Sequence, residues 1–200
     1  MSKAAARWIA PAGGVVGDHG GMDDGRMTER EMVEVLGDDG EVVGTVTRAE
    51  MRSGRLRHRC TFVVLRDPDG RVLVHRRSPH KDMWPDRWDL AAGGVVQAGE
   101  DWDLSAVREL AEELGVTGAV LEPLVDGPVA YDDRDVSELA RVWSATWDGP
   151  VSFDDGEVVE ARWVTIAELT EMVRTEEFVA DSLALVLPLI DGSVRERPAT

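Results

Sequence analysis

Apolar and β-branched residues recur at strand spacing along much of the chain from residue 31 onward. Runs of this kind, separated by turn-forming residues, predict β-strands. Residues 31–46 predict a hairpin with Asp38-Asp39-Gly40 at its turn, and residues 60–77 predict a second hairpin that turns between Asp67 and Gly70. Between them, a short helix is expected from Thr47, as its N-cap, through Met51.

The pattern becomes more varied after residue 77. Residues 78–88 hold two prolines and predict a loop, and residues 89–96 predict a short strand. Further strands are expected within 120–129, 137–149 and 160–165, and closing helices over 168–174 and 181–190. Strands, one mid-chain helix, more strands and terminal helices together predict an α/β or α+β layered fold, with a mixed sheet between helices.

The mid-chain helix is expected over 102–114, with Asp101 or Asp103 as its N-cap and Gly115 just past its end. At 3.6 residues per turn, one side collects apolar residues, and we expect that side to face the core. Its members are Leu104, Val107, Leu110, Ala111 and Leu114. The opposite side carries Glu109, Glu112 and Glu113, with Arg108 beside them and Glu100 just before the helix.

Three carboxylates on one helical face repel one another, by roughly 0.2–0.5 kcal/mol per pair one turn apart. A hard divalent cation such as Mg²⁺ would reverse the sign of that interaction, because it prefers oxygen ligands and bridges carboxylates to substrate phosphates. This spacing therefore favours a metal platform. A solvated acidic face is the alternative interpretation, and it is the usual one for an isolated acidic cluster.

Neighbouring residues decide between these alternatives. Gly94 lies six positions before Glu100, and Arg108-Glu109 follow eight positions after Glu100. Leu110, Glu112-Glu113 and Gly115-Val116 complete the run. The whole stretch from Gly94 to Val116 resembles the Nudix box, Gly-x5-Glu-x7-Arg-Glu-U-x-Glu-Glu-x-Gly-U with U aliphatic, at every specified position.

The resemblance implies a Nudix-type α-β-α sandwich that cleaves a diphosphate bond by attack of water. It implies that Glu109, Glu112 and Glu113 are catalytic and bind Mg²⁺, for which Mn²⁺ can substitute, and that Arg108 orients a glutamate. Glu100 would support the loop or reach the metal through water, and Gly94 would allow close backbone packing near the substrate. The proton acceptor is a box glutamate or a distant one, for which Glu157 and Glu160 are candidates, although both could equally be exposed loop carboxylates. Glu157 is also a candidate metal ligand.

A narrower resemblance lies upstream of the box. Residues 56–59 and 74–78, with Lys81, Pro85 and Trp88, are similar to the type I isopentenyl-diphosphate isomerases of the same superfamily. That likeness implies that Arg77 and Lys81 contact the diphosphate and that His58 and Glu138 belong to a metal site. For His58, a hydrogen-bonded structural histidine is the commoner role, and surface ion pairing would also explain Arg77 and Lys81.

The chain departs from these isomerases at one decisive place. They need a cysteine within the segment that matches 89–94, where this chain has alanines and glycines. Its only cysteine, Cys60, lies on a predicted strand, where a small buried thiol is ordinary. We therefore expect a pyrophosphohydrolase acting on a nucleoside diphosphate derivative or another organic diphosphate. An isomerase and a non-catalytic diphosphate-binding domain are the alternatives.

Composition limits the partners and the cellular location that we expect. The net charge of −17 repels a phosphate backbone, so nucleic acid is not an expected partner. No apolar run approaches the length of a membrane span, and the single cysteine favours a cytoplasmic protein. Residues 1–29 lack lasting periodicity and predict a flexible tail, with an ordered arm on a partner subunit as the alternative, before a domain at 30–200. A homodimer is a family-style expectation.

Overall fold

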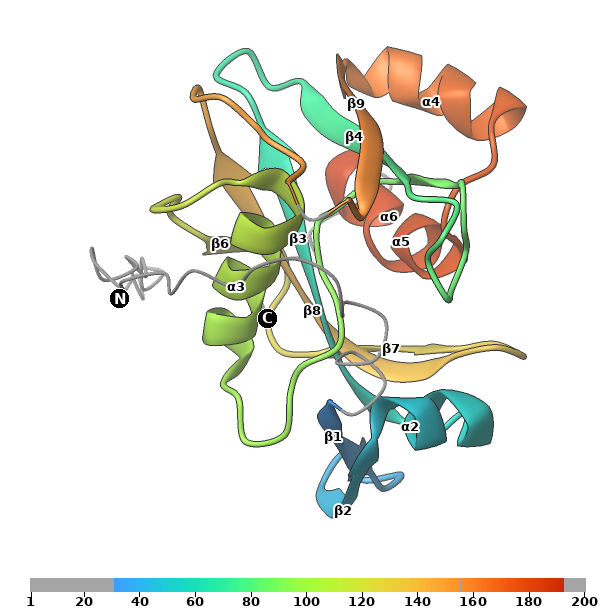
Figure 1. The fold of residues 1–200 in the computed structure, drawn as a ribbon. Helices are drawn as coiled ribbons and strands as arrows, with labels where there is room; N and C mark the ends of the chain where they lie inside the picture. The colour runs from blue at the N-terminus through green and yellow to red at the C-terminus, as the bar shows by residue number, and fades with distance from the viewer. Residues whose placement is uncertain (1–30, 155, 193–200) are drawn as a thin grey trace, which may run out of the picture.

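The computed structural model describes residues 31–154 and 156–192, so the predicted tail at 1–29 lies outside the described residues and stays a prediction. Figure 1 shows a central sheet with helices on both sides and a small hairpin unit at one end. In chain order the elements are β1 (Met32–Leu36), β2 (Val42–Thr47), α2 (Arg48–Gly54), β3 (His58–Arg66), β4 (Val72–Arg77), β5 (Trp88–Asp89), α3 (Trp102–Leu114), β6 (Glu122–Pro123), β7 (Val129–Asp132), β8 (Ser137–Thr146), β9 (Val158–Val164), α4 (Ile166–Thr175), α5 (Ala180–Leu185) and α6 (Leu187–Ile190).

The sheet is mixed, as predicted. Its two longest strands, β3 and β8, run parallel in an unbroken register from His58 opposite Glu138 to Arg66 opposite Thr146. The other pairings of this sheet are antiparallel: β4 with β3, β5 and β9, and β8 with β6 and β7. A parallel pair is normally covered on both faces, so β3 and β8 form the buried centre of the molecule.

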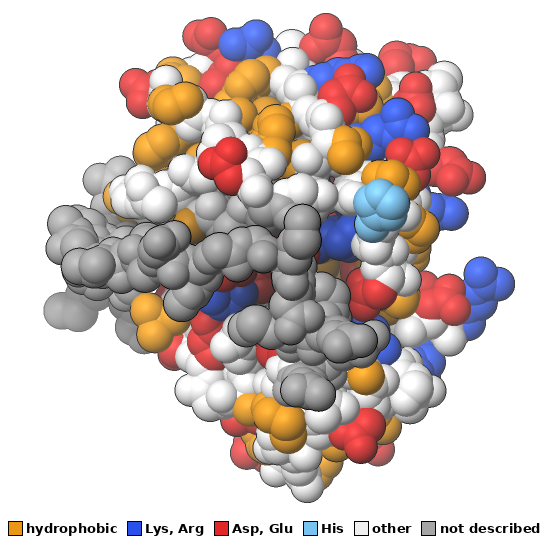
Figure 2. All heavy atoms as spheres, in the orientation of Figure 1, with side chains coloured by type: hydrophobic (Ala, Val, Ile, Leu, Met, Phe, Trp, Pro, Cys, Tyr) orange, Lys and Arg blue, Asp and Glu red, His pale blue; other side chains and the backbone are white. Residues whose placement is uncertain are grey.

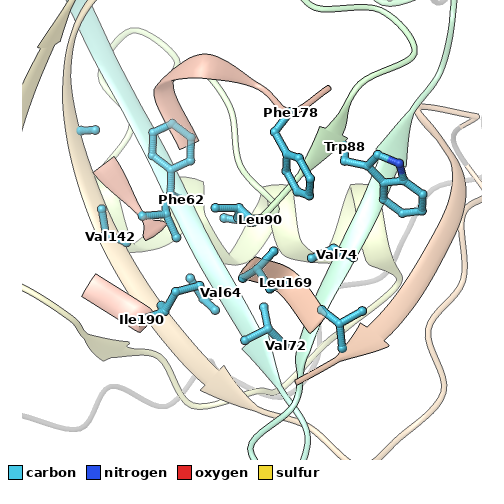
Figure 3. Close-up of a cluster of buried hydrophobic side chains, with 14 of the residues drawn as sticks. Phe62, Val64, Val72, Val74, Trp88, Leu90, Val142, Leu169, Phe178 and Ile190 are labelled. Atoms are coloured by element: carbon cyan, nitrogen blue, oxygen red, sulfur yellow. The ribbon is translucent and has the colours of Figure 1, made fainter. Parts of the chain in front are cut away.

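Side chains of β3 alternate between two cores on opposite faces of the sheet. Phe62 and Val64 point into a cluster closed by α4, α5 and α6, in which Leu169, Phe178 and Ile190 are buried (Figure 3). Val63 and Leu65 pack in the other cluster, under α3. The predicted sandwich of helices around a mixed sheet is therefore confirmed.

The second predicted hairpin is correct only at its turn. Strands β3 and β4 pair at one position, Arg66 with Val72, and then diverge, β3 to pair with β8 and β4 with β9. A segment of residues 92–96 lies along β3 instead: Val63 N donates to Ala92 O at 2.7 Å, and Thr61 N donates to Gly94 O at 2.9 Å. The predicted strand at 89–96 is thus a regular strand only at Trp88–Asp89, followed by this segment.

The N-terminal hairpin and helix match their predictions. Thr47 caps α2 with a capping box that includes Glu50, and β1 pairs with β2. Val33, Met51 and Val95 form a small buried cluster that joins this unit to the segment beside β3. The unit therefore packs directly against the part of the chain that begins the glutamate motif.

The predicted closing helix at 181–190 is two short helices, α5 and α6, because Pro188 in the first turn of α6 cannot continue a preceding helix. No helix within the described residues is long and apolar enough to span a membrane. On the face drawn in Figure 2, acidic and basic side chains alternate over its described part, without a continuous basic patch.

The segment beside β3 yields a prediction about stability. A Cβ atom added at Gly93 would lie 1.8 Å from the carbonyl oxygen of Thr61, so Gly93→Ala forces two backbones apart. We expect a loss of about 3 kcal/mol or more in the free energy of unfolding, measured by chemical denaturation. Gly44→Ala is the matched control, because its added Cβ meets nothing within 4 Å. Equal losses in the two variants would contradict this account.

Candidate active site

The glutamate helix α3 has the predicted bounds and caps. Asp101 is the N-cap and accepts a hydrogen bond from Asp103 N at 2.9 Å, and Gly115 ends the helix with a φ of 64°. The predicted apolar face is wrong at Leu104, which is 52% exposed. Ala106 takes its place beside Leu110 and Leu114, which turns the buried face toward the glutamates.

Arg108 joins the acidic residues of the motif. Its Nε and Nη2 each donate to one carboxylate oxygen of Glu100, both at 2.9 Å. Its Nη1 donates to Glu109 Oε1 at 2.7 Å and to Glu112 Oε2 at 2.9 Å. One guanidinium therefore holds carboxylates from the loop and from two turns of α3, and such charge-assisted bonds are strong and directional.

The side chain of Glu113 contacts a different set of residues. Its Oε2 accepts a hydrogen bond from Gly93 N at 3.1 Å, and its other oxygen lies 3.8 Å from Lys81 Nζ. His75 Nε2 lies 3.9 Å away, and burial lowers the pKa of this histidine to about 4. The Glu113 side chain is 2% exposed and does not line the cavity described below.

Burial is the main influence on two of these carboxyl groups. It raises the pKa of Glu109 to about 7, although Arg108 pulls in the opposite direction. It raises the pKa of Glu113 to about 8, against the pull of Lys81. Both groups therefore hold protons near neutral pH that a bound cation would have to expel.

Gly94 lets the chain pass close to the helix. A Cβ atom there would lie 2.8 Å from the carboxylate atoms of Glu109, so the absence of a side chain leaves room for that carboxylate. Gly93 is as restricted, against Thr61, and its N–H holds Glu113. The motif specifies Gly94 but not Gly93. The only hint in the sequence that Gly93 is also restricted was its position next to a second glycine.

A cavity of about 580 Å³ opens beside the glutamates. Its lining includes three residues of α3 and three from elsewhere in the chain. The first three are Arg108, Glu109 and Glu112, and the others are Arg77 at the end of β4, Lys81 in the loop that follows, and Glu157 just before β9. Lys81 is ion-paired with Glu157. Arg77 donates to Met83 O at 3.2 Å and lies 3.7 Å from Asp89. The two predicted phosphate contacts thus share one cavity with the motif glutamates Glu109 and Glu112.

His58 and Glu138 lie at the start of β3 and β8. Their side chains are 2% exposed, with Nε2 and Oε2 3.9 Å apart. Nδ1 of His58 contacts Leu56 O at 2.9 Å, and burial lowers the pKa of this histidine to about 4. Burial raises the pKa of Glu138, which lines the cavity together with Cys60. Cys60 is therefore buried as expected, but it also faces the cavity.

Other candidates lie apart from the motif or have structural roles. Glu160 is ion-paired with Arg162 and is not among the residues that line the cavity. Trp84 lines the cavity, and Trp88 is buried in the core. The ring of Trp102 contacts the guanidinium groups of Arg59 and Arg141, at 5.3 and 5.4 Å. Of the three tryptophans near the motif, Trp84 alone belongs to the lining.

Sequence reasoning missed several cavity residues. Arg48 and Arg52 enter from α2, and Asp89 and Asp181 from β5 and α5. The available signal for the arginines was their spacing of four residues on a predicted helix, which places them on one face. No sequence pattern around Asp181 indicated a place in the cavity, because only the tertiary fold brings α5 there.

The donor set fits a divalent cation held by few protein ligands. Among residues 31–154 and 156–192, no group of three or more His, Cys, Asp or Glu side chains could hold a metal ion. Glu109 and Glu112 nevertheless offer hard oxygen ligands at the cavity and already share one positive charge, on Nη1 of Arg108. Mg²⁺ commonly binds one or two carboxylates together with substrate phosphates, and this pair suits that arrangement.

The chain matches known proteins along most of its length. A family model for the NUDIX domain matches residues 56–184. The chain is 39% identical over 187 residues to the uncharacterized Nudix hydrolase YfcD of Salmonella typhi, across 88% of this chain and 97% of that protein. Identity to YfcD of Escherichia coli K12 is 37% over 163 residues, across 81% and 88% of the two chains. The crystal structure of DR0079 from Deinococcus radiodurans aligns with a TM-score of 0.67 and 25% identity, over 82% of this chain and 100% of that one.

The raised pKa values predict how cation binding depends on pH. Mg²⁺ should bind more tightly as pH rises from about 6 to about 8, because the carboxyl of Glu109 must lose its proton before it can act as a ligand. Calorimetry in buffers of different ionisation enthalpy should detect the released proton. Glu109→Gln should weaken binding and remove the part of this pH dependence that Glu109 contributes, leaving the part that Glu113 contributes. An affinity that is constant over this range would contradict the assignment.

Proposed function

Because the chain belongs to the Nudix family and is a hydrolase of acid anhydrides, we propose that it is a metal-dependent pyrophosphohydrolase. Its substrate is a nucleoside diphosphate derivative or another organic diphosphate, and its cation is Mg²⁺, with Mn²⁺ as a substitute. The observation that supports this most directly is the contact of one guanidinium nitrogen of Arg108 with both Glu109 and Glu112 at the cavity. Both carboxylates are already held by the positive charge of the guanidinium group. A divalent metal ion can therefore replace part of that contact.

Each motif residue has a separate task in this proposal. Glu109 and Glu112 bind the cation from the cavity wall, and Glu113 binds it or positions it from behind Gly93. Arg108 stays anchored to Glu100 through its two-pronged hydrogen bond, so its charge remains beside the glutamates. When bound, the cation supplies neutralisation of charge on the diphosphate oxygens.

Two further cations of the cavity hold the substrate in this proposal. Arg77 and Lys81 are directed to the cavity, and a guanidinium or ammonium group there can bind phosphate oxygens. Lys81 is paired with Glu157 in the free protein, so a phosphate would compete with that carboxylate. Glu157 lines the cavity and Glu160 does not, so Glu157 is the preferred base to accept a proton from attacking water.

Several expectations from the sequence stay proposals. We propose that the chain belongs to the isomerase-like branch and that His58 and Glu138 have a metal role. We also propose a cytoplasmic location, a homodimer and a single domain from residue 30. For His58 and Glu138, the buried pair at 3.9 Å is the supporting contact. A cavity of about 580 Å³ suits a small-molecule substrate, and a net charge of −17 does not favour nucleic acid as a partner.

A panel of diphosphate compounds with Mg²⁺ tests the proposal, with products identified by mass spectrometry. We expect cleavage of at least one compound, and we expect Glu112→Gln and Glu113→Gln to lower kcat/KM roughly 100-fold or more through loss of charge at the cation. Glu171→Gln is the control, because that side chain is 69% exposed and is ion-paired with Arg174 on the same surface helix, α4. Full activity of both motif variants, or no cleavage of any compound with Mg²⁺ or Mn²⁺, would contradict the proposal.

The same panel tests the alternative function, that of an isomerase. Cys60 and Glu138 both line the cavity, which is the observation in favour of that function. Burial raises the pKa of the Cys60 thiol, and the segment at 89–94 carries no thiol at all. We expect no isomer exchange when isopentenyl diphosphate is supplied with Mg²⁺. Rapid exchange without release of phosphate would favour the isomerase over the hydrolase.

A further inference from the structure

The N-terminal unit, made of β1, β2 and α2, is bonded to the loop that precedes the glutamate helix α3. Residues 97–100 form this loop. Two contacts come from backbone: Ala98 N donates to Met32 O at 2.8 Å, and Val33 forms an antiparallel bridge with Gln97 (Figure 1). The unit lies wholly before the residues that the NUDIX model matches. The loop of the motif is therefore held partly by a part of the chain that the family model does not cover.

An ion pair between Glu34 of β1 and Arg59 of β3 holds the same loop through side chains. Glu34 Oε2 lies 2.7 Å from Arg59 Nη2, and Glu34 Oε1 accepts a hydrogen bond from Gly99 N at 3.1 Å. Arg59 Nη2 also donates to the backbone carbonyl of Glu100 at 2.9 Å. The pair thus binds a backbone donor and a backbone acceptor at two adjacent residues of the loop.

The surroundings of Arg59 fix its guanidinium in this position. Its side chain is 14% exposed and that of Glu34 is 19% exposed, so water competes less for their contact than at an exposed ion pair. The guanidinium also lies 5.3 Å from the ring centre of Trp102, the first residue of α3. Because side chains alternate along a strand, Arg59 shares with Val63 the face of β3 that α3 covers. One side chain therefore contacts strand β1, the loop and the helix.

Glu100 connects this pair to the motif glutamates. Its carboxylate accepts two hydrogen bonds from Arg108, and Nη1 of Arg108 donates to both Glu109 and Glu112. Arg59 holds the backbone of Glu100, so it limits where the Glu100 carboxylate can lie. A shift of the loop would therefore carry the Arg108 guanidinium away from the two cavity carboxylates.

We propose that Glu34 and Arg59 are positioning residues of the active site, which set the orientation of Arg108 through the backbone of Glu100. This inference rests on the proposed function, because the carboxylates that Arg108 holds are those proposed to bind Mg²⁺. Neither Glu34 nor Arg59 is among the described residues that line the cavity. The N-terminal unit then contributes to cation binding without contacting the substrate.

Solvent exchange of the Nε–H proton of Arg108 tests this positioning directly. It can be measured by ¹⁵N NMR without any cation, and Arg108→Lys identifies the resonance. We expect Arg59→Gln to speed this exchange roughly tenfold or more, because the charge-assisted bond to Glu100 opens more often. Glu34→Gln should have a smaller effect in the same direction, since its amide oxygen can still accept from Gly99 N. Arg59→Lys should recover part of the loss, because it restores charge but not the planar fork.

Mn²⁺ affinity, measured by electron paramagnetic resonance, tests the consequence at the cation site. We expect Arg59→Gln to weaken Mn²⁺ binding roughly tenfold or more, as loss of a partner beyond the ligands commonly does. Glu41→Gln is the matched control for Glu34, because it removes the same charge from an exposed position between β1 and β2. Arg141→Gln is the control for Arg59, because that guanidinium also contacts the Trp102 ring, at 5.4 Å. Both controls should leave the exchange and the affinity unchanged.

Two measurements separate positioning from general damage to the fold. Thermal unfolding identifies a variant that does not fold, and if Arg59→Gln is one, then Arg59→Lys and Glu34→Gln decide. In hydrolysis assays, folded variants should need roughly tenfold more Mg²⁺ for half-maximal rate. Their KM for the substrate at saturating Mg²⁺ should stay unchanged, which a disordered cavity would not allow.

The outcomes distinguish this inference from the proposed function. Unchanged exchange at Arg108 in the folded variants of Glu34 and Arg59, or an equal effect in Arg141→Gln, would overturn the positioning role even if the compound panel shows hydrolysis. Faster exchange with unchanged Mn²⁺ affinity would overturn its effect on the cation. Faster exchange in these variants, with no Mn²⁺ binding by the unmodified protein, would overturn the proposed cation site and leave the positioning of Arg108 standing.

Discussion

The structure depends on a close passage of backbone past Gly93 and Gly94. A side chain at Gly93 would collide with the carbonyl of Thr61, and one at Gly94 would collide with the carboxylate of Glu109. Because the segment passes so closely, it can hydrogen-bond along β3 and separate that strand from β4. The same passage brings the N–H of Gly93 to Glu113. The fold and the position of the glutamates thus follow from one steric constraint.

Electrostatics at the site follow from that geometry. Pressing α3 against the segment buries Glu109 and Glu113, and burial alone would keep both protonated. Arg108 and Lys81 offset part of this cost from opposite sides. The resulting carboxyl groups hold protons near neutral pH yet lie beside positive charge. Such groups give up a proton readily when a divalent cation approaches.

Local signals in the sequence were sufficient for most elements and for the motif, but not for long-range pairing. The caps of α3 and α2 follow from Asp101 and Thr47, and the positions of the glutamates follow from helical spacing. The divergence of β3 and β4 could not be predicted, because the hydrophobic pattern of a strand does not specify its partner. The exposure of Leu104 and the entry of Arg48 and Asp181 into the cavity likewise depend on how distant elements pack.

Glu109 and Glu112, held by Arg108 beside Gly94, are proposed to bind a divalent cation. Anomalous diffraction from crystals soaked in Mn²⁺ locates that ion without reference to activity. We expect an anomalous peak against the carboxylates of Glu109 and Glu112, absent in Glu112→Gln. A peak between His58 and Glu138 alone, with none at the motif glutamates, would contradict it.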